Sequence, residues 1–305
     1  MKPKKIVVKD NSLIDASFNL GLVEQRLMLL AIVEARELSE LTYNTPVEVS
    51  ARSYMEQFGI NEKESYSALR DAAITLKRRE FSYIDKYKSF DAVTSDSWVN
   101  KITYVKDQGL VVLYFTEIVI KMISRLEQQF TRYYLDQVSN FKSKYSIRLY
   151  ELIMKWRKQG ITQRYAIDDL RSKLGVEPSQ YRTMSLFKTN VLERAIDEIN
   201  QQTDLIVSYE QFKIGKSISH IQFSLKSRLL IETIDLDHDG KNFELTLKQI
   251  DMFSHRLAQQ PEFGSLYADV GETTEEFILR IKKLLQDPHW VETHYDFLEK
   301  VGFNC

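Results

Sequence analysis

The first two-thirds of the chain present one order of expected elements twice. Each copy predicts an apolar helix, a short strand, a short helix that ends in hydrophobe-Gly-hydrophobe, a long helix and a β-hairpin. The first copy ends by about residue 125 and the second by about residue 230. This order is that of a winged helix-turn-helix. The sequence therefore predicts an α+β, helix-rich protein with two winged helix-turn-helix domains in tandem.

The two copies correspond segment by segment, and Gly59 and Gly175 stand where the tight turn between two helices needs a residue that tolerates positive φ. The first copy predicts a helix around 25–30, a strand at 46–49, helices at 51–57 and 61–80, and strands on both sides of 107–109. The second predicts a helix at 146–153, a strand at 165–167, helices at 168–173 and about 182–201, and strands on both sides of 215–216.

Length and composition bound the organisation of the chain. With 305 residues, of which 43% are hydrophobic, it can bury core for two or three domains. We expect a first winged helix over 1–130, a second over 131–230, and an acidic linker with a small helical C-terminal appendage over 231–305. No segment is apolar enough to cross a bilayer, and residues 1–5 lack the apolar core of a secretory signal. The single cysteine, Cys305, excludes an internal disulfide, and these features together predict a cytoplasmic protein with no membrane partner.

The net charge of −1 conceals an uneven distribution. Residues 1–230 carry 35 Lys and Arg against 28 Asp and Glu, whereas residues 231–305 carry 7 against 15. Charge varies along many chains, but here the basic part is also the repeated part. Because positive surfaces attract phosphates, the division favours double-stranded DNA as the partner of the repeated units.

The long helix of the second copy is where base reading is expected. Apolar residues at three- and four-residue spacing predict its buried stripe: Met184, Phe187, Val191, Ala195 and Ile199. A recognition helix inserts its first turns into the major groove, and the acidic residues of this helix come later. A merely solvated face is the alternative, but the duplicated context favours base contacts. The outward positions predicted to make them are Arg182, Thr183, Ser185, Leu186, Lys188, Thr189 and Asn190.

Three further groups of cations and hydroxyls are expected to contact phosphates. They lie at the start of the apolar helix of the second copy, at its hairpin tip, and on the long helix of the first copy. The residues are, in that order, Lys142, Lys144, Ser146 and Arg148; Lys213, Lys216, Ser217 and His220; and Arg70 and Lys77. The long helix of the first copy begins with a capping-box pair, Asn61 and Glu64, and its first turn is acidic. The first unit is therefore expected to contact the DNA backbone or another protein rather than bases.

Three segments together resemble one known family. They are residues 21–30, residues 146–152, and residues 187–200 with the adjoining 203–205. In this order they are similar to the replication initiator (Rep) proteins of iteron-controlled, theta-replicating bacterial plasmids. The resemblance covers about residues 5–228, and the combination is more specific than any one of its motifs.

The resemblance implies a pair of winged helices that bind short direct repeats at a plasmid origin and help to open it. It implies that monomers bind the repeats, while dimers formed largely through the first unit bind the operator of the protein's own gene and repress it. Host replication proteins are implied partners. The second unit is the family's main reader, with base contacts around Thr183, Leu186, Thr189 and Asn190. No catalytic residue, metal or cofactor is implied.

Several motifs of other functions fail on their spacing. Residues 215–217 resemble the end of a phosphate-binding loop, but Glu210 stands where the earlier glycine is required. His289 and His294 are too far apart for the metal pair of a rolling-circle nuclease. Residues 235–240 match the start of a calcium loop, but its twelfth position is Thr246. We therefore expect an acidic linker turn there and no metal site.

Residues 245–303 predict a small helical region. Thr246 with Gln249 and Thr273 with Glu276 have capping-box spacing, and apolar residues follow both pairs at helical intervals. This region is either a protein-binding domain or a packing appendage. Two alternatives to an initiator stay open for the whole chain. One is a tandem winged-helix transcriptional regulator that binds an inverted-repeat operator, and the other is a metal-dependent, origin-nicking nuclease.

Overall fold

The computed structural model describes residues 5–124, 129–228, 245–269, 271–287, 290–291 and 294–303. Its residues form two compact units, divided between Leu225 and Lys226. The calcium-loop-like residues 235–240, His289 and Cys305 lie outside the described residues. Among the residues that are described, no helix is long and apolar enough to span a membrane.

The first winged helix has the predicted order of elements. They are α2 (Leu22–Arg36), β3 (Val47–Ser50), α3 (Ala51–Phe58), α4 (Glu62–Leu76), β6 (Val99–Val105) and β7 (Leu110–Phe115). The turn between α3 and α4 places Gly59 at φ 62°, as its position in the sequence predicted. Strands β3, β7 and β6 form an antiparallel sheet in that order, with Val47, Val49, Val111 and Leu113 buried against the helices.

The long helix of this domain is shorter than predicted, ending at Leu76 and not near residue 80. Strand β4 (Glu80–Tyr87) begins there and pairs with β5 (Phe90–Ser97) in a hairpin. Phe81 and Tyr83 alternate inward from β4, and the Phe81 ring lies 4.7 Å from that of the buried Trp98. This packing favours an extended strand where continued helix was predicted.

Several short elements complete the first domain. They are β1 (Ile6–Asp10), α1 (Asn11–Asp15), β2 (Ser17–Phe18), η1 (Lys106–Gln108), α5 (Glu117–Ile123), β8 (Phe130–Tyr134) and α6 (Asp136–Ser139). Strand β1 pairs antiparallel with β8, more than 100 residues later, and β2 joins the edge of β4. The start of the chain is thereby tied to the segment that leads into the second domain.

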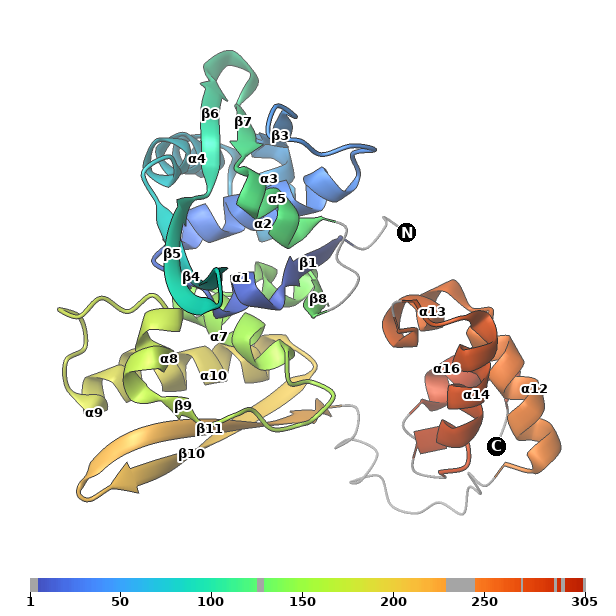
Figure 1. Ribbon diagram of the computed structural model, residues 1–305. Coiled ribbons are helices and arrows are strands. Elements are labelled where there is room, and N and C mark those ends of the chain that lie inside the picture. The colour runs from blue at the N-terminus through green and yellow to red at the C-terminus, as the bar shows by residue number, and fades with distance from the viewer. Residues whose placement is uncertain are drawn as a thin grey trace. The chain divides into compact units, whose positions relative to one another are not determined.

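The second winged helix repeats the plan. Its elements are α7 (Lys144–Met154), β9 (Tyr165–Ala166), α8 (Ile167–Lys173), α9 (Met184–Phe187), η2 (Lys188–Glu193), α10 (Arg194–Gln202), β10 (Leu205–Ile214) and β11 (Ser217–Ser227). The sheet order β9-β11-β10 matches β3-β7-β6 of the first copy, which confirms the duplication predicted from sequence. Figure 1 shows the two hairpins, β6–β7 and β10–β11, each beside the helices of its own domain.

The two domains share one hydrophobic core, which runs from Val7 to Leu225. Helix α7 lies inside it, packed against α1, α2 and β8 of the first domain and against η2 and α10 of the second. Gly175, at φ 70° in the second helix-helix turn, lies so close to β2 that an added Cβ would be 2.4 Å from the Phe18 carbonyl oxygen. The helix-turn-helix of the second domain therefore rests directly on the first domain.

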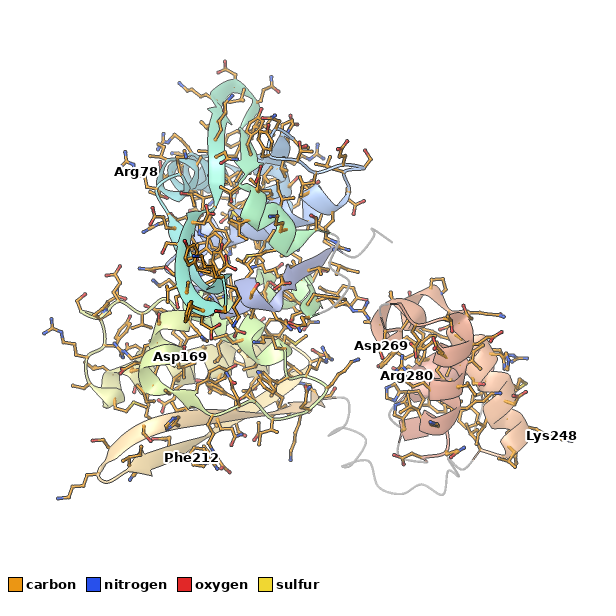
Figure 2. The ribbon with its side chains drawn as sticks, viewed as in Figure 1. Arg78, Asp169, Phe212, Lys248, Asp269 and Arg280 are labelled. Carbon is orange, nitrogen blue, oxygen red and sulfur yellow. The ribbon has the colours of Figure 1, made fainter. Side chains whose placement is uncertain are left out.

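The C-terminal unit is a small helical domain with a core of its own. Its helices are α12 (Leu247–Ala258), α13 (Pro261–Tyr267), α14 (Thr274–Leu284) and α16 (Tyr295–Lys300). The capping boxes predicted for this unit are present at the starts of α12 and α14. Of the pair predicted for α4, the structure gives the bond in which the Asn61 side chain accepts the Glu64 N–H. Arg280 of α14 donates to Glu272 and to the Tyr267 carbonyl at 2.6 Å, and Figure 2 labels it beside Asp269.

Candidate nucleic-acid interface

The predicted recognition helix consists of α9, η2 and α10 in unbroken succession. It begins two residues later than predicted, because the Thr183 hydroxyl accepts the Leu186 N–H and makes Thr183 the N-cap. Arg182 therefore precedes the helix as an exposed residue. Four of the five stripe residues are buried, and Met184 is half-buried. Leu192 and Ile196 are buried as well.

The opposite face of the first turns is open. Thr183, Ser185 and Thr189 are exposed, Leu186 is 50% exposed, and Lys188 and Asn190 are half-buried. A leucine exposed to this extent gains nothing from the folded core, but its methyl groups suit contact with a thymine methyl. The seven predicted base-contacting side chains thus lie on one continuous stretch at the amino end of the helix, and which bases they meet stays a prediction.

The helix contains a π-helical turn that the sequence reading did not anticipate. Segment η2 interrupts the α-helical register between Phe187 and Arg194. Such turns insert one extra residue, and they are frequent at functional sites. Within it, the side-chain amide of Asn190 donates to the Leu186 carbonyl at 3.0 Å.

The β10–β11 hairpin supplies a basic tip. Lys213, Lys216 and Ser217 are exposed there, while His220 is half-buried and its ring nitrogen lies 3.0 Å from the Ser219 hydroxyl. A hollow of about 290 Å³ separates the hairpin from the recognition helix. It is lined by Met184, Ser185, Lys188, Thr189, Glu193 and Ile218. Figure 1 shows α9 and the hairpin tip at the same end of the domain.

Arg164 is an addition that the sequence analysis missed. It is exposed one residue before β9, and its guanidinium carbon lies 3.8 Å from the centroid of the Phe212 ring on β10. Figure 2 labels Phe212 on this hairpin. Stacking on the ring holds a cation at the hairpin surface. The pairing of β9 with β11 brings Arg164 there, and no local pattern reports that pairing.

The start of α7 presents less than was predicted. Lys142 is exposed, but Glu198 already accepts its backbone N–H at 3.0 Å and that of Ser143 at 3.2 Å. The Lys144 ammonium donates to the Asn19 amide oxygen at 2.5 Å, and burial lowers its pKa. The amides at this helix start therefore already have an anionic partner, and the side chain of Lys142 is the group most open to a phosphate.

Ser146 and Arg148 were predicted to contact phosphate, and the structure contradicts both. Ser146 is fully buried and Arg148 is 1% exposed, because α7 is covered by both domains. The Arg148 guanidinium donates to the carbonyls of Ile14, Ala16 and Lys173 at 2.9–3.0 Å. It joins the first domain to the end of α8 and cannot reach DNA.

Glu151 balances the buried charge. Its carboxylate accepts from Arg148 at 2.9 Å, from Lys9 at 2.6 Å and from the Tyr133 hydroxyl at 2.7 Å. Burial alone would raise the pKa of Glu151, but the charges of Lys9 and Arg148 outweigh it and hold that pKa below its ordinary value. Lys9, Tyr133, Arg148 and Glu151 therefore form a brace between the domains, and we call them the interdomain brace.

On the first domain, the two predicted phosphate contacts are partly engaged. Arg70 pairs with Asp71 at 2.9 Å on an exposed face, and the Lys77 ammonium donates to the Val99 carbonyl at 3.2 Å. Arg78, which the sequence analysis did not select, is exposed just beyond α4, and Figure 2 labels it on the outer surface. Arg78 is thus the more accessible cation of this helix end.

The comparisons with known proteins agree with this architecture. The family model described as "Initiator Replication protein, WH1" matches residues 6–154, and the model "Initiator Rep protein, WH2" matches residues 166–225. The chain belongs to the initiator replication (Rep) protein family. The first match covers the first winged helix and continues through α7, and the second covers the rest of the second winged helix from Ala166 onward. The C-terminal helical unit lies beyond both.

This Rep protein is similar to curated proteins of Escherichia coli. It is 24% identical over 231 residues to an uncharacterised 27.6 kDa protein, covering 72% of this chain and 95% of the other. It is 27% identical over 166 residues to the PI protein, covering 49% and 54%. Among solved structures, the Pi initiator protein in complex with iteron DNA matches with a TM-score of 0.61 and 21% identity, covering 74% of this chain and 99% of that one. This last likeness shows a shared fold.

Proposed function

We propose that this Rep protein initiates plasmid replication by binding double-stranded direct repeats, or iterons, at the origin and helping to open it. The observation that carries the proposal is the open amino end of the recognition helix beside a basic hairpin tip, in a chain that matches both initiator domains. The solved structure of the Pi initiator protein in complex with iteron DNA, which has a similar fold, supports the same ligand.

The roles of the residues follow from their exposure. Base contacts are assigned to the recognition-helix residues Arg182, Thr183, Ser185, Leu186, Lys188, Thr189 and Asn190. Phosphate contacts are assigned to Lys142, Lys213, Lys216, Ser217 and His220, with Arg164 added, and on the first domain to Arg70, Lys77 and Arg78. Lys144 is assigned a weaker part because it is partly buried. Cations that neutralise phosphates supply affinity, and contacts with base edges supply specificity.

Self-association belongs to the proposal. Ile84, Tyr87, Phe90 and Val93 are apolar and exposed on the β4–β5 hairpin, and β5 is an edge strand of its sheet. Edge strands with exposed apolar side chains are suited to pairing with a second chain. A dimer formed there would repress the protein's own promoter, while monomers would act at the origin with host replication proteins.

The chain is proposed to act by binding energy alone, without a catalytic centre and in the cytoplasm, where plasmid DNA is located. Within the described residues, no cluster of three His, Cys, Asp or Glu side chains is placed to hold a metal ion. A regulator without origin function is the nearer alternative, because it would use the same two winged helices, and a nicking enzyme is the more distant one.

Footprinting on the DNA beside the gene tests the proposal. Protection that recurs once in each direct repeat, without strand cleavage in Mg²⁺, is the expected result. Protection of a single inverted repeat and nothing else would favour the transcriptional regulator. Cleavage that requires Mg²⁺ would favour the nuclease. A matched DNA with the repeats scrambled serves as the control for non-specific binding.

A further inference from the structure

The π turn changes which side chains of the recognition helix share a face. In an α-helix, residues five apart point about 140° away from each other. The wider turn of η2 narrows this separation, and the Lys188 ammonium lies 4.0 Å from a Glu193 carboxylate oxygen. An ion pair between these two positions is thus a consequence of the wide turn.

The same turn uses the side chain of Asn190. Its amide donates to the Leu186 carbonyl, which in an α-helix would be the acceptor of the Asn190 backbone N–H. A side chain that supplies a hydrogen bond where backbone geometry has changed stabilises that geometry. The wide turn is therefore supported by the residues within it.

Glu193 also faces the β10–β11 hairpin. Burial raises the pKa of Tyr209 on β10, and the charge of the nearby Glu193 carboxylate raises it further. The Tyr209 ring itself packs against the buried Phe223 at 6.2 Å. Lys188 and Glu193 both line the hollow between helix and hairpin. The carboxylate therefore lies between the core-anchored hairpin and a cation on the recognition helix.

We propose that Glu193 is a positioning residue which, by pairing with Lys188 across the π turn, selects the base that Lys188 contacts. The proposal rests on the DNA-reading function proposed above. A free lysine on a flexible stem meets phosphates and several base edges alike. A lysine held on one side by a carboxylate approaches one base edge, and for a cation in the major groove that edge is the O6 and N7 of guanine.

The test uses the full chain and measures sequence preference. Wild type, Glu193→Gln and the control Asp197→Asn are each given a library of the repeat with single base-pair changes, and relative affinities are determined by competition. Asp197 is exposed one turn later, so both variants remove one negative charge from the same helix. Both should raise non-specific affinity equally. Glu193→Gln alone should reduce the preference at one base pair by about tenfold, the scale of one good base contact.

Two further variants separate positioning from a general structural effect. In a Lys188→Met background, Glu193→Gln should change the preference no further, since there is no cation left to position. Tyr209→Phe, which keeps the ring and removes the hydroxyl, should weaken the preference at the same base pair by a smaller factor. Because Glu193 is 46% exposed, none of these changes should lower the melting temperature by more than a few degrees.

The outcomes distinguish this inference from the function on which it rests. If wild type selects the repeat while Glu193→Gln and Asp197→Asn have the same preferences, the positioning role is wrong and the DNA-reading function stands. The positioning role is also wrong if Glu193→Gln alters the preference equally with and without Lys188. If wild type selects no sequence, both proposals fall together.

Discussion

The two winged helices have the same sheet order, but the space between the wing and the long helix is filled in the first domain and open in the second. In the first domain, Gly109 at the β6–β7 turn lies under the Tyr66 ring of α4, and an added Cβ would be 2.0 Å from a ring carbon. In the second, Gly215 at the β10–β11 turn has no atom within 4 Å of an added Cβ, and a hollow of about 290 Å³ adjoins the helix. One copy closes the space with its own side chain, and the other leaves it open to a ligand.

The long helices differ in the same sense. Helix α4 is regular and begins with an acidic turn, and of its cations Arg70 pairs with Asp71 while Lys77 donates to the Val99 carbonyl. The recognition helix of the second domain begins with exposed hydroxyls and a leucine, and contains a π turn. The duplicated scaffold thus has the same sheet order in both copies, and only the second has the exposed helix face to which base reading is assigned.

The largest expected effect tests whether Arg148 belongs to the interior between the two domains and not to the DNA-binding surface. Arg148→Met should lower the free energy of unfolding by about 3–5 kcal/mol, because it leaves the buried Glu151 with one charged partner fewer. Urea denaturation measures it, with the exposed Lys142→Met as the matched control, expected within about 0.5 kcal/mol. If Arg148→Met lost DNA binding without losing stability, Arg148 would be a DNA contact and not part of the interdomain brace.

The next prediction tests the comparison of the two wings. Gly109→Ala and Gly215→Ala both place alanine at positive φ and carry a similar backbone cost. Gly109→Ala should cost about 1–3 kcal/mol more, because its methyl group meets the Tyr66 ring. Thermal unfolding of the two variants gives the difference directly. Equal losses would mean that the first wing is as open as the second.

Substitutions at predicted base contacts test whether the long helices of the two domains have different roles on DNA. Lys188→Ala and Asn190→Ala should each weaken binding to the preferred repeat by about 1–3 kcal/mol, and Asn190→Ala, which removes no charge, should leave non-specific DNA nearly unaffected. Arg70→Ala, on the long helix of the first domain, should lower affinity for all sequences alike. Titrations with the repeat and with a scrambled DNA measure both quantities. If all three variants behave identically, the assignment of base reading to the second domain is wrong.

The smallest expected effect is a change in the salt dependence of DNA affinity when a cation that contacts phosphate is removed. Lys213→Ala on the second wing and Arg78→Ala beyond α4 should each reduce the slope of log affinity against log salt by about 1, whatever the sequence of the DNA. Affinity measured over a series of salt concentrations gives the slope. A slope that changes only for Lys213→Ala would restrict backbone contact to the second domain.

Local patterns predicted most of the fold, since the helices, the wings, the two turn glycines and the capping boxes at Thr246 and Thr273 are properties of short segments. The pairing of β1 with β8 and the position of α7 between two domains depend on residues far apart in sequence, so no local pattern reports them. A signal for Arg148 was nevertheless present. Arg148 and Glu151 are three residues apart within an otherwise apolar helix, and such a pair is typical of a buried ion pair.

The π turn was beyond prediction for a different reason. The spacing of Phe187, Val191, Ala195 and Ile199 fits a regular helix, so the wide turn is recognised only from the backbone of η2. Leu192 and Ile196 are buried beside this stripe. The residues predicted to contact bases all lie at the amino end of this helix, but the directions of their side chains depend on a backbone irregularity that the sequence pattern conceals.

The contact beneath Gly175 has a consequence for the length of DNA that one molecule can span. Its counterpart Gly59 has free space around an added Cβ, whereas at Gly175 a single methyl group would wedge the second helix-turn-helix away from Phe18. With backbone touching backbone, the separation between the two long helices has no side chain through which substitution could adjust it gradually. If both winged helices contact one DNA molecule as proposed, we expect the spacing of their contacts to be fixed and the repeats bound by this protein to share one length.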